Sequence, residues 1–268
     1  MKAFVIDTTR CSGCFCCQIV CKDEHCGNDW MPYAKPQPII GQFWGKINQY
    51  VRGTIPKVKV HFVFVPCQHC KDAPCIEACP VEGALYARTD GLVIIDPKKC
   101  TGCQNCIDAC PYGCIFYNNP LQIAQKCTGC AHLVDRGWPI KEPRCVDACP
   151  HEAIKFGEES ELSSLISQAE TLNPEYGLNT RVHYIGLPKR FIGGTVYDPG
   201  ADEVVIGATC TLSGAGTGTA TTDGFGDFWF EGLEVGTFSL RIVAAGKTKT
   251  IPSISTEKDV NMGDIALT

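Results

Sequence analysis

Sixteen of the twenty cysteines fall into four groups of four with short, repeated spacing. Closely spaced thiolates of this kind bind iron–sulfur clusters, because three of them can wrap one side of a [4Fe-4S] cubane. The fourth lies one turn further on and, in two-cluster ferredoxins, reaches the neighbouring cluster. The groups are Cys11, Cys14, Cys17 and Cys21; Cys67, Cys70, Cys75 and Cys79; Cys100, Cys103, Cys106 and Cys110; and Cys127, Cys130, Cys145 and Cys149.

The second, third and fourth groups each end in a Cys-Pro pair, at Pro80, Pro111 and Pro150. Proline cannot continue a helix and turns the chain towards the next element. The fourth group contains a 14-residue insert that runs from Ala131 to Arg144. Four copies of one pattern indicate an internal repeat with clusters in coupled pairs.

Zinc and disulfides are the competing interpretations of these groups. Structural zinc uses four ligands, usually from two separated Cys-x-x-Cys pairs, whereas Cys100, Cys103 and Cys106 pack three thiolates together. Disulfide frameworks belong to small secreted domains. Residues 1–7 are typical of a short strand and lack the apolar core of a secretory signal. Iron–sulfur binding is therefore the prediction.

The remaining cysteines and the histidines near the groups are not needed as ligands. Cys16 and Cys26 flank the first group, and we expect them to be small, buried apolar thiols. His69 lies between two cysteines of the second group and His151 follows Pro150; we expect packing or solvent exposure for both. Four cysteines lie outside the groups: Cys16, Cys26, Cys114 and Cys210.

Complete ligand sets favour electron transfer over catalysis. A cluster that acts on a substrate keeps one iron without a protein ligand, and here every group supplies four thiolates. We therefore expect no catalytic residues in this chain. Two alternatives stay open: clusters that only hold the fold together, and a free polyferredoxin that acts alone. Four oxidised clusters would each add about −2 with their thiolates and take the formal charge of −5 to about −13.

Charge and hydropathy exclude two classes of partner. The formal charge is negative and the lysine pairs are too small to follow a phosphate backbone, so nucleic acid is not expected. No apolar run approaches the roughly 18 residues of a membrane span. The sequence therefore predicts a soluble protein without a membrane span of its own, whose export, if any, would depend on a partner.

A length of 268 residues predicts two domains at roughly 150 residues each. Residues 1–156 are predicted to form an α+β, ferredoxin-like domain of two pseudo-symmetric two-cluster units. Residues 157–190 are predicted to be an amphipathic helix and connector, and residues 191–268 an all-β sandwich with strand alternation at Phe228, Phe230, Phe238 and Leu240. The apolar face of the helix has i, i+3, i+4 spacing: Leu162, Leu165, Ile166, Ala169 and Leu172.

The order of the groups resembles that in iron–sulfur subunits of the DMSO-reductase family of molybdopterin oxidoreductases. The likeness lies in the longer second spacing, the insert in the fourth group and the stretch from Thr180 to Ile185. In that family the first group pairs with the fourth and the second with the third. The resemblance therefore implies four ligand sets: set A (Cys11, Cys14, Cys17, Cys149), set B (Cys127, Cys130, Cys145, Cys21), set C (Cys67, Cys70, Cys75, Cys110) and set D (Cys100, Cys103, Cys106, Cys79).

The resemblance also implies cofactors and a partner. Each set would hold one [4Fe-4S] cluster, four in all, or three where one set is unoccupied. The partner would be a large catalytic subunit that carries molybdenum on two pterin guanine dinucleotides, in a heterodimer. Residues 191–268 resemble carboxypeptidase-regulatory-like or transthyretin-like sandwiches through the segments Gly194-Thr195-Val196, Gly207-Ala208 and Thr222-Asp223-Gly224. This ending, in place of a membrane anchor, resembles the molybdenum hydroxytransferase branch; a sulfur-compound reductase subunit is the alternative.

Overall fold

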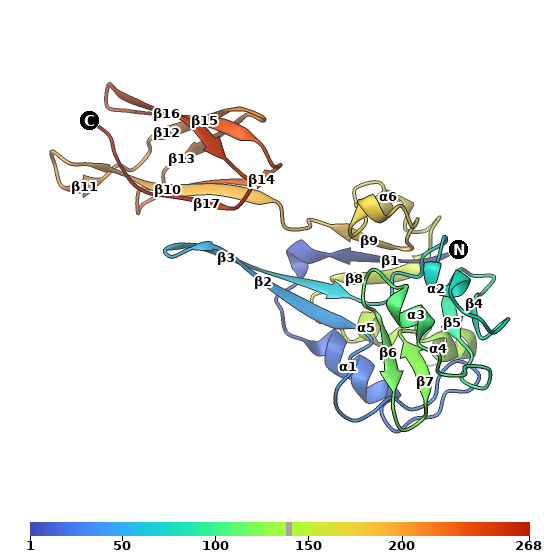
Figure 1. The fold of residues 1–268 in the computed structure, drawn as a ribbon. Helices are drawn as coiled ribbons and strands as arrows, with labels where there is room; N and C mark the ends of the chain where they lie inside the picture. Colours follow the sequence, from blue (N-terminus) through green and yellow to red (C-terminus); the bar gives the residue numbers. More distant parts are fainter. Residues whose placement is uncertain (138–140) are drawn as a thin grey trace. The chain divides into compact units, whose positions relative to one another are not determined.

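The computed structural model describes residues 1–137 and 141–268 and divides the chain into two compact units (Figure 1). The first unit contains residues 1–49 and 62–187, and the second contains residues 50–61 and 188–268. Most regular structure is strand, and the helices are short.

Strand β1 (Lys2–Asp7) is the centre of the first unit's three-stranded sheet, which has the order β8-β1-β9. It pairs antiparallel with β8 (Ile154–Glu158) and parallel with β9 (Val182–Ile185). Residues 3–6 are all buried, because a strand covered on both faces is apolar throughout rather than in alternation. The prediction of an N-terminal strand is confirmed.

The chain between β1 and β8 contains the four cysteine groups, which lie on short helices and in loops, and two small hairpins (Figure 1). Helices α2, α3 and α5 end a few residues before Pro80, Pro111 and Pro150, because the residue before a proline disfavours helical dihedrals. The elements are η1 (Thr8–Arg10), α1 (Cys16–His25), α2 (Pro74–Glu77), β4 (Leu85–Ala87), β5 (Val93–Ile95), α3 (Asn105–Asp108), β6 (Ile115–Asn118), β7 (Ile123–Lys126), α4 (Ala131–Arg136) and α5 (Arg144–Asp147).

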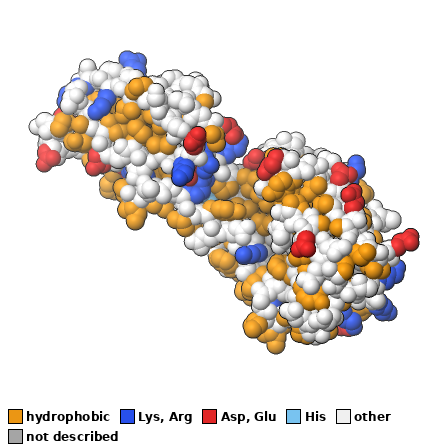
Figure 2. Space-filling view, viewed as in Figure 1, with side chains coloured by type: hydrophobic (Ala, Val, Ile, Leu, Met, Phe, Trp, Pro, Cys, Tyr) orange, Lys and Arg blue, Asp and Glu red, His pale blue; other side chains and the backbone are white. Residues whose placement is uncertain are grey.

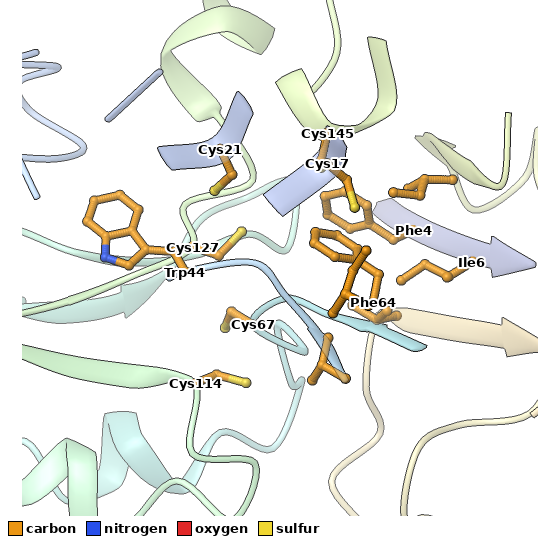
Figure 3. Packing of buried hydrophobic residues seen from close by; sticks show 14 of the residues in the cluster. Phe4, Ile6, Cys17, Cys21, Trp44, Phe64, Cys67, Cys114, Cys127 and Cys145 are labelled. Atoms are coloured by element: carbon orange, nitrogen blue, oxygen red, sulfur yellow. The ribbon is translucent and has the colours of Figure 1, made fainter. Parts of the chain in front are cut away.

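The core of the first unit is built from aromatic rings and thiols together. Figure 3 shows Phe4 and Phe64 packed beside Cys17, with Trp44 near Cys127. Buried cysteines thus lie among the apolar side chains of this cluster.

The predicted amphipathic helix is much shorter in the structure than its pattern indicates. Only α6 (Ser163–Ile166) is α-helical, followed by the 3-10 turn η2 (Pro174–Tyr176). Glu170 forms two backbone hydrogen bonds with Tyr184, of 2.8 and 2.7 Å, which take the chain out of helical pairing. The hydroxyl of Ser167 donates to a carbonyl in the preceding turn, and serines that bond the backbone in this way weaken helices.

Two four-stranded sheets form the second unit and enclose one apolar core. Phe228, Phe230, Phe238 and Leu240 are buried in it, as the strand alternation predicts. Their strands alternate because one face of each sheet is in contact with water. The strands are β10 (Arg190–Asp198), β11 (Glu203–Val204), β12 (Thr209–Gly214), β13 (Gly218–Thr221), β14 (Asp227–Leu233), β15 (Thr237–Ala244), β16 (Lys247–Ser255) and β17 (Val260–Ala266).

The end of the hairpin formed by β2 (Lys46–Thr54) and β3 (Lys57–Val65) belongs to the second unit. Lys57 forms an ion pair with Asp227, although its side chain is only 4% exposed. This ion pair joins residues 50–61 to the β sandwich, because Asp227 is part of β14. A boundary drawn along the sequence at residue 191 does not anticipate this insertion.

Candidate functional site

In every group, the second of the two residues between the first two cysteines has a left-handed backbone conformation, with positive φ. This turn points the backbone N–H of that residue back at the first cysteine: Gly129 N lies 3.4 Å from the Cys127 Sγ, and His69 N lies 3.5 Å from the Cys67 Sγ. Glycine adopts positive φ without strain, and His69 is the exception among the four. The φ values are +70° at Gly13, +45° at His69, +71° at Gly102 and +63° at Gly129.

The β1–β8 pairing brings the first group to the end of the fourth. Ile6 is in register with Ile154, and Asp7 N donates to the Ala153 carbonyl at 2.7 Å. β1 leads through η1 to Cys11, and β8 begins five residues after Cys149. The four thiols of set A consequently line one small cavity.

Set B forms where α1 contacts α5. All four of its cysteines are buried. Burial raises the pKa of Cys21 well above its ordinary value, and the nearby thiols of Cys127 and Cys130 raise it further. The same neighbours, with Cys21 itself, raise the pKa of Cys145. These mutual effects indicate that the four thiols of set B lie together.

Sets C and D are built around the β4–β5 hairpin and the contact between α2 and α3. Leu85 is in register with Ile95, so the end of the second group returns beside the third. The thiols of set D line one small cavity. In set C, burial raises the pKa of Cys70 to about 12, with contributions from Cys67, Cys75 and Cys110.

The sets follow one another in the order A, B, C, D. Burial raises the pKa of one thiol at each of three junctions, and a thiol of the neighbouring set raises it further. The junctions are Cys17 with Cys145 between A and B, Cys127 with Cys67 between B and C, and Cys75 with Cys106 between C and D. Thiols of different sequence groups thus lie near one another, and the nested ligand sets stay a prediction.

Each set offers only sulfur, the donor that iron–sulfur clusters take. Backbone N–H groups also donate to the sulfurs, from Ala153 to Cys149 at 3.3 Å and from Ala124 to Cys100 at 3.4 Å. Such donors stabilise the negative charge of a bound cluster. Among the described residues, no three Cys, His, Asp or Glu side chains converge closely enough to bond one metal ion. The cavities of sets A and D lie between their thiols.

The residues near the groups take varied positions. His69 is fully buried and packs against Phe4, whereas His151 is exposed, so the expectation for both histidines is confirmed. Cys16 and Cys26 are only partly buried, contrary to expectation. Cys16 lies at the start of α1 and hydrogen-bonds the exposed Cys14, which keeps it near the surface.

His25 is a site residue that the sequence analysis missed. Its Nε2 lies 3.8 Å from the Cys130 Sγ, and its ring packs against Trp44 at a centroid distance of 4.5 Å. Burial, with a contribution from His132, lowers its pKa to about 3, so the ring is neutral. A signal was available, because His25 follows Cys21 by one helical turn and so lies on the same face of α1.

Lys126 is the second missed residue. It directly precedes Cys127 and is 2% exposed, in a place where charged side chains are rare unless paired. A basic residue next to a cysteine group gives too weak a signal for the sequence to indicate burial.

The surface carries no pattern typical of nucleic-acid binding on the face drawn in Figure 2, where acidic and basic side chains are interspersed with apolar ones. None of the helices in residues 1–137 and 141–268 is long and apolar enough to cross a membrane.

Two family models match separate parts of the chain. The 4Fe-4S dicluster domain matches residues 58–159, which contain the second, third and fourth cysteine groups. The carboxypeptidase regulatory-like domain matches residues 192–268, the β sandwich of the second unit. The chain therefore combines an iron–sulfur domain with a regulatory-like β domain.

Curated relatives extend this likeness to the whole chain. The pyrogallol hydroxytransferase small subunit of Pelobacter acidigallici is 35% identical and covers 98% of both chains. A tetrathionate reductase subunit of Salmonella typhimurium is 35% identical over 71% of this chain and 74% of its own. A subunit of the anaerobic dimethyl sulfoxide reductase of Escherichia coli is 36% identical over 59% of this chain and 74% of its own. The protein is thus a member of the iron–sulfur subunits of the DMSO-reductase family of molybdopterin oxidoreductases.

Proposed function

We propose that this chain holds four [4Fe-4S] clusters, one in each of sets A to D, and conducts electrons for a molybdopterin catalytic subunit. The proposal is supported by thiols of different sequence groups that line one cavity, as the four of set A and the four of set D do. When bound, each cluster accepts and passes on one electron without bonding a reactant. The two cluster pairs would form two pseudo-symmetric ferredoxin-like units.

The chain's own residues supply the environment of this conduit. Buried thiols exclude water, and backbone N–H groups such as those of Gly129 and Ala153 donate to the sulfurs. These donors and the local burial set reduction potentials. No residue of this chain takes part in the chemistry of a substrate.

The partner we propose is a large subunit with molybdenum on two pterin guanine dinucleotides, in a cytoplasmic heterodimer. Likeness to the pyrogallol hydroxytransferase small subunit over 98% of the chain supports the conversion of pyrogallol to phloroglucinol as the reaction of the complex. That reaction is redox-neutral overall. The clusters would then activate the molybdenum centre by reduction rather than cycle in every turnover.

A structural role is the second candidate, because the core of the first unit is rich in thiols. Purification from the native source tests both. We expect a large molybdenum subunit to co-purify, with about sixteen irons and sixteen acid-labile sulfides per chain. Reduced-cluster EPR signals in samples frozen during activation support electron transfer. Their absence favours a structural role, and recovery of a lone monomer refutes the complex.

A further inference from the structure

Lys126 ends strand β7 and places an ammonium group inside the first unit. The side chain is buried, and burying a charge is costly unless it is paired. Its Nζ donates to the Cys127 carbonyl at 3.0 Å and to the Val93 carbonyl. These two bonds satisfy donors but do not neutralise the charge, so other groups must compensate it.

Thiols of two different sets surround the ammonium. It hydrogen-bonds Cys67 and lies near Cys75, both of set C, and it lies near Cys127 of set B. Lys126 directly precedes Cys127 of set B, and the Val93 peptide that accepts from its ammonium leads through His69 to Cys67 of set C. The ammonium therefore lies at the junction of the two sets.

Two hydrogen bonds made by Val93 of β5 help to hold the ammonium in place. The carbonyl of Val93 accepts from Lys126, and its N–H donates to the His69 Nδ1 at 2.9 Å. His69 is fully buried, and its backbone N–H donates to the Cys67 sulfur. Because the His69 Nδ1 accepts this hydrogen bond, it carries no proton, so the ring is neutral and Lys126 is the cation of this network.

We propose that Lys126 supplies a fixed positive charge between the clusters of sets B and C, which raises both reduction potentials and lets an electron cross from one cluster pair to the other. This rests on the proposed function, since it requires a cluster in each set. Two neighbouring anionic clusters repel an added electron, and a charge interacts strongly in a low-dielectric interior. The cation offsets this repulsion at the one junction that joins the pairs.

The test is an EPR-monitored redox titration of the purified complex carrying Lys126→Met, Lys126→Gln or Lys126→Arg. We expect both neutral variants to lower the equilibrium constant for reduction of the clusters of sets B and C by about tenfold or more. For one electron, each tenfold decrease lowers the reduction potential by about 59 mV. The clusters of sets A and D should move less. Lys126→Arg should retain the potentials, because it retains the charge. Lys155→Met, at a partly exposed lysine of β8, is the matched control and should shift none of them as far.

The possible outcomes distinguish the proposed role of Lys126 from the proposed electron-transfer function on which it rests. Unchanged potentials in a neutral variant with all clusters assembled would overturn the role of Lys126 and leave electron conduction intact. Wild-type protein without clusters in sets B and C would instead overturn the proposed function. If the neutral variants do not assemble clusters, assembly in Lys126→Arg supports a need for positive charge at the junction. Failure of all three variants makes Lys126 a packing residue and refutes the proposal.

Discussion

The nested pairing of cysteines can be tested with two alanine substitutions. Cys21 belongs to the first sequence group and Cys145 to the fourth, yet both lie in set B. If set B holds one cluster, Cys21→Ala and Cys145→Ala each destroy the same centre. If each sequence group held its own cluster, the two substitutions would destroy different centres.

The iron content of the double variant distinguishes the two arrangements. Each single variant should lose about four of about sixteen irons under either arrangement. The double variant should retain about twelve irons under nested pairing and about eight under local pairing. Alanine suits both helical positions, so α1 and α5 should persist.

Iron and acid-labile sulfide per chain are the measurement, with EPR of the reduced protein as the second readout. Cys210→Ala is the matched control, because Cys210 is fully buried in the second unit, on β12, and lies in none of the four sets. The control should keep about sixteen irons. A double variant with about eight irons would refute the nested sets.

Other perturbations have equally direct readouts. His25→Leu removes the ring nitrogen near the Cys130 sulfur, so the cluster of set B should become harder to reduce in an EPR titration; an unchanged potential would exclude a hydrogen bond to that sulfur. Lys57→Met should lower the free energy of unfolding of the second unit by about 1–3 kcal/mol in urea, since the lysine is buried and its partner Asp227 is partly exposed. Burial by itself raises the pKa of Asp227, but hydrogen bonds, foremost from Lys57, outweigh it and lower the pKa. The stabilisation should therefore be complete at a pH above 3.8, the pKa of Asp227 in the unfolded chain, and disappear as the pH falls through the lower pKa of the folded protein. The unfolding free energy of Lys57→Met should depend less on pH in this range. An equal pH dependence in the variant and the wild type would contradict the ion pair. Phe228→Ala should cost the second unit about 3–5 kcal/mol, because the ring is 1% exposed in the sandwich core; a loss below about 1 kcal/mol in thermal unfolding would mean that the core refills.

Local chemistry was readable from the residues alone. Cysteine spacing depends on which sulfurs one loop can present, so it predicted the donor type, and the strand alternation at Phe238 and Leu240 predicted a β sandwich that the structure contains. The apolar spacing around Leu165 overstated the helix, since pairing between Glu170 and Tyr184 competes with it.

Long-range placement depended on tertiary structure. The meeting of Cys21 with Cys145 follows from strand pairing and helix contacts between segments more than a hundred residues apart, which no local spacing encodes. Lys126 and His25 are ordinary polar residues in the sequence, and they gain importance only because the fold buries them against sulfurs. Lys57 likewise joins the sandwich through a partner 170 residues away. Short-range patterns specify which groups are available, whereas the burial and pairing of distant segments decide which of them meet.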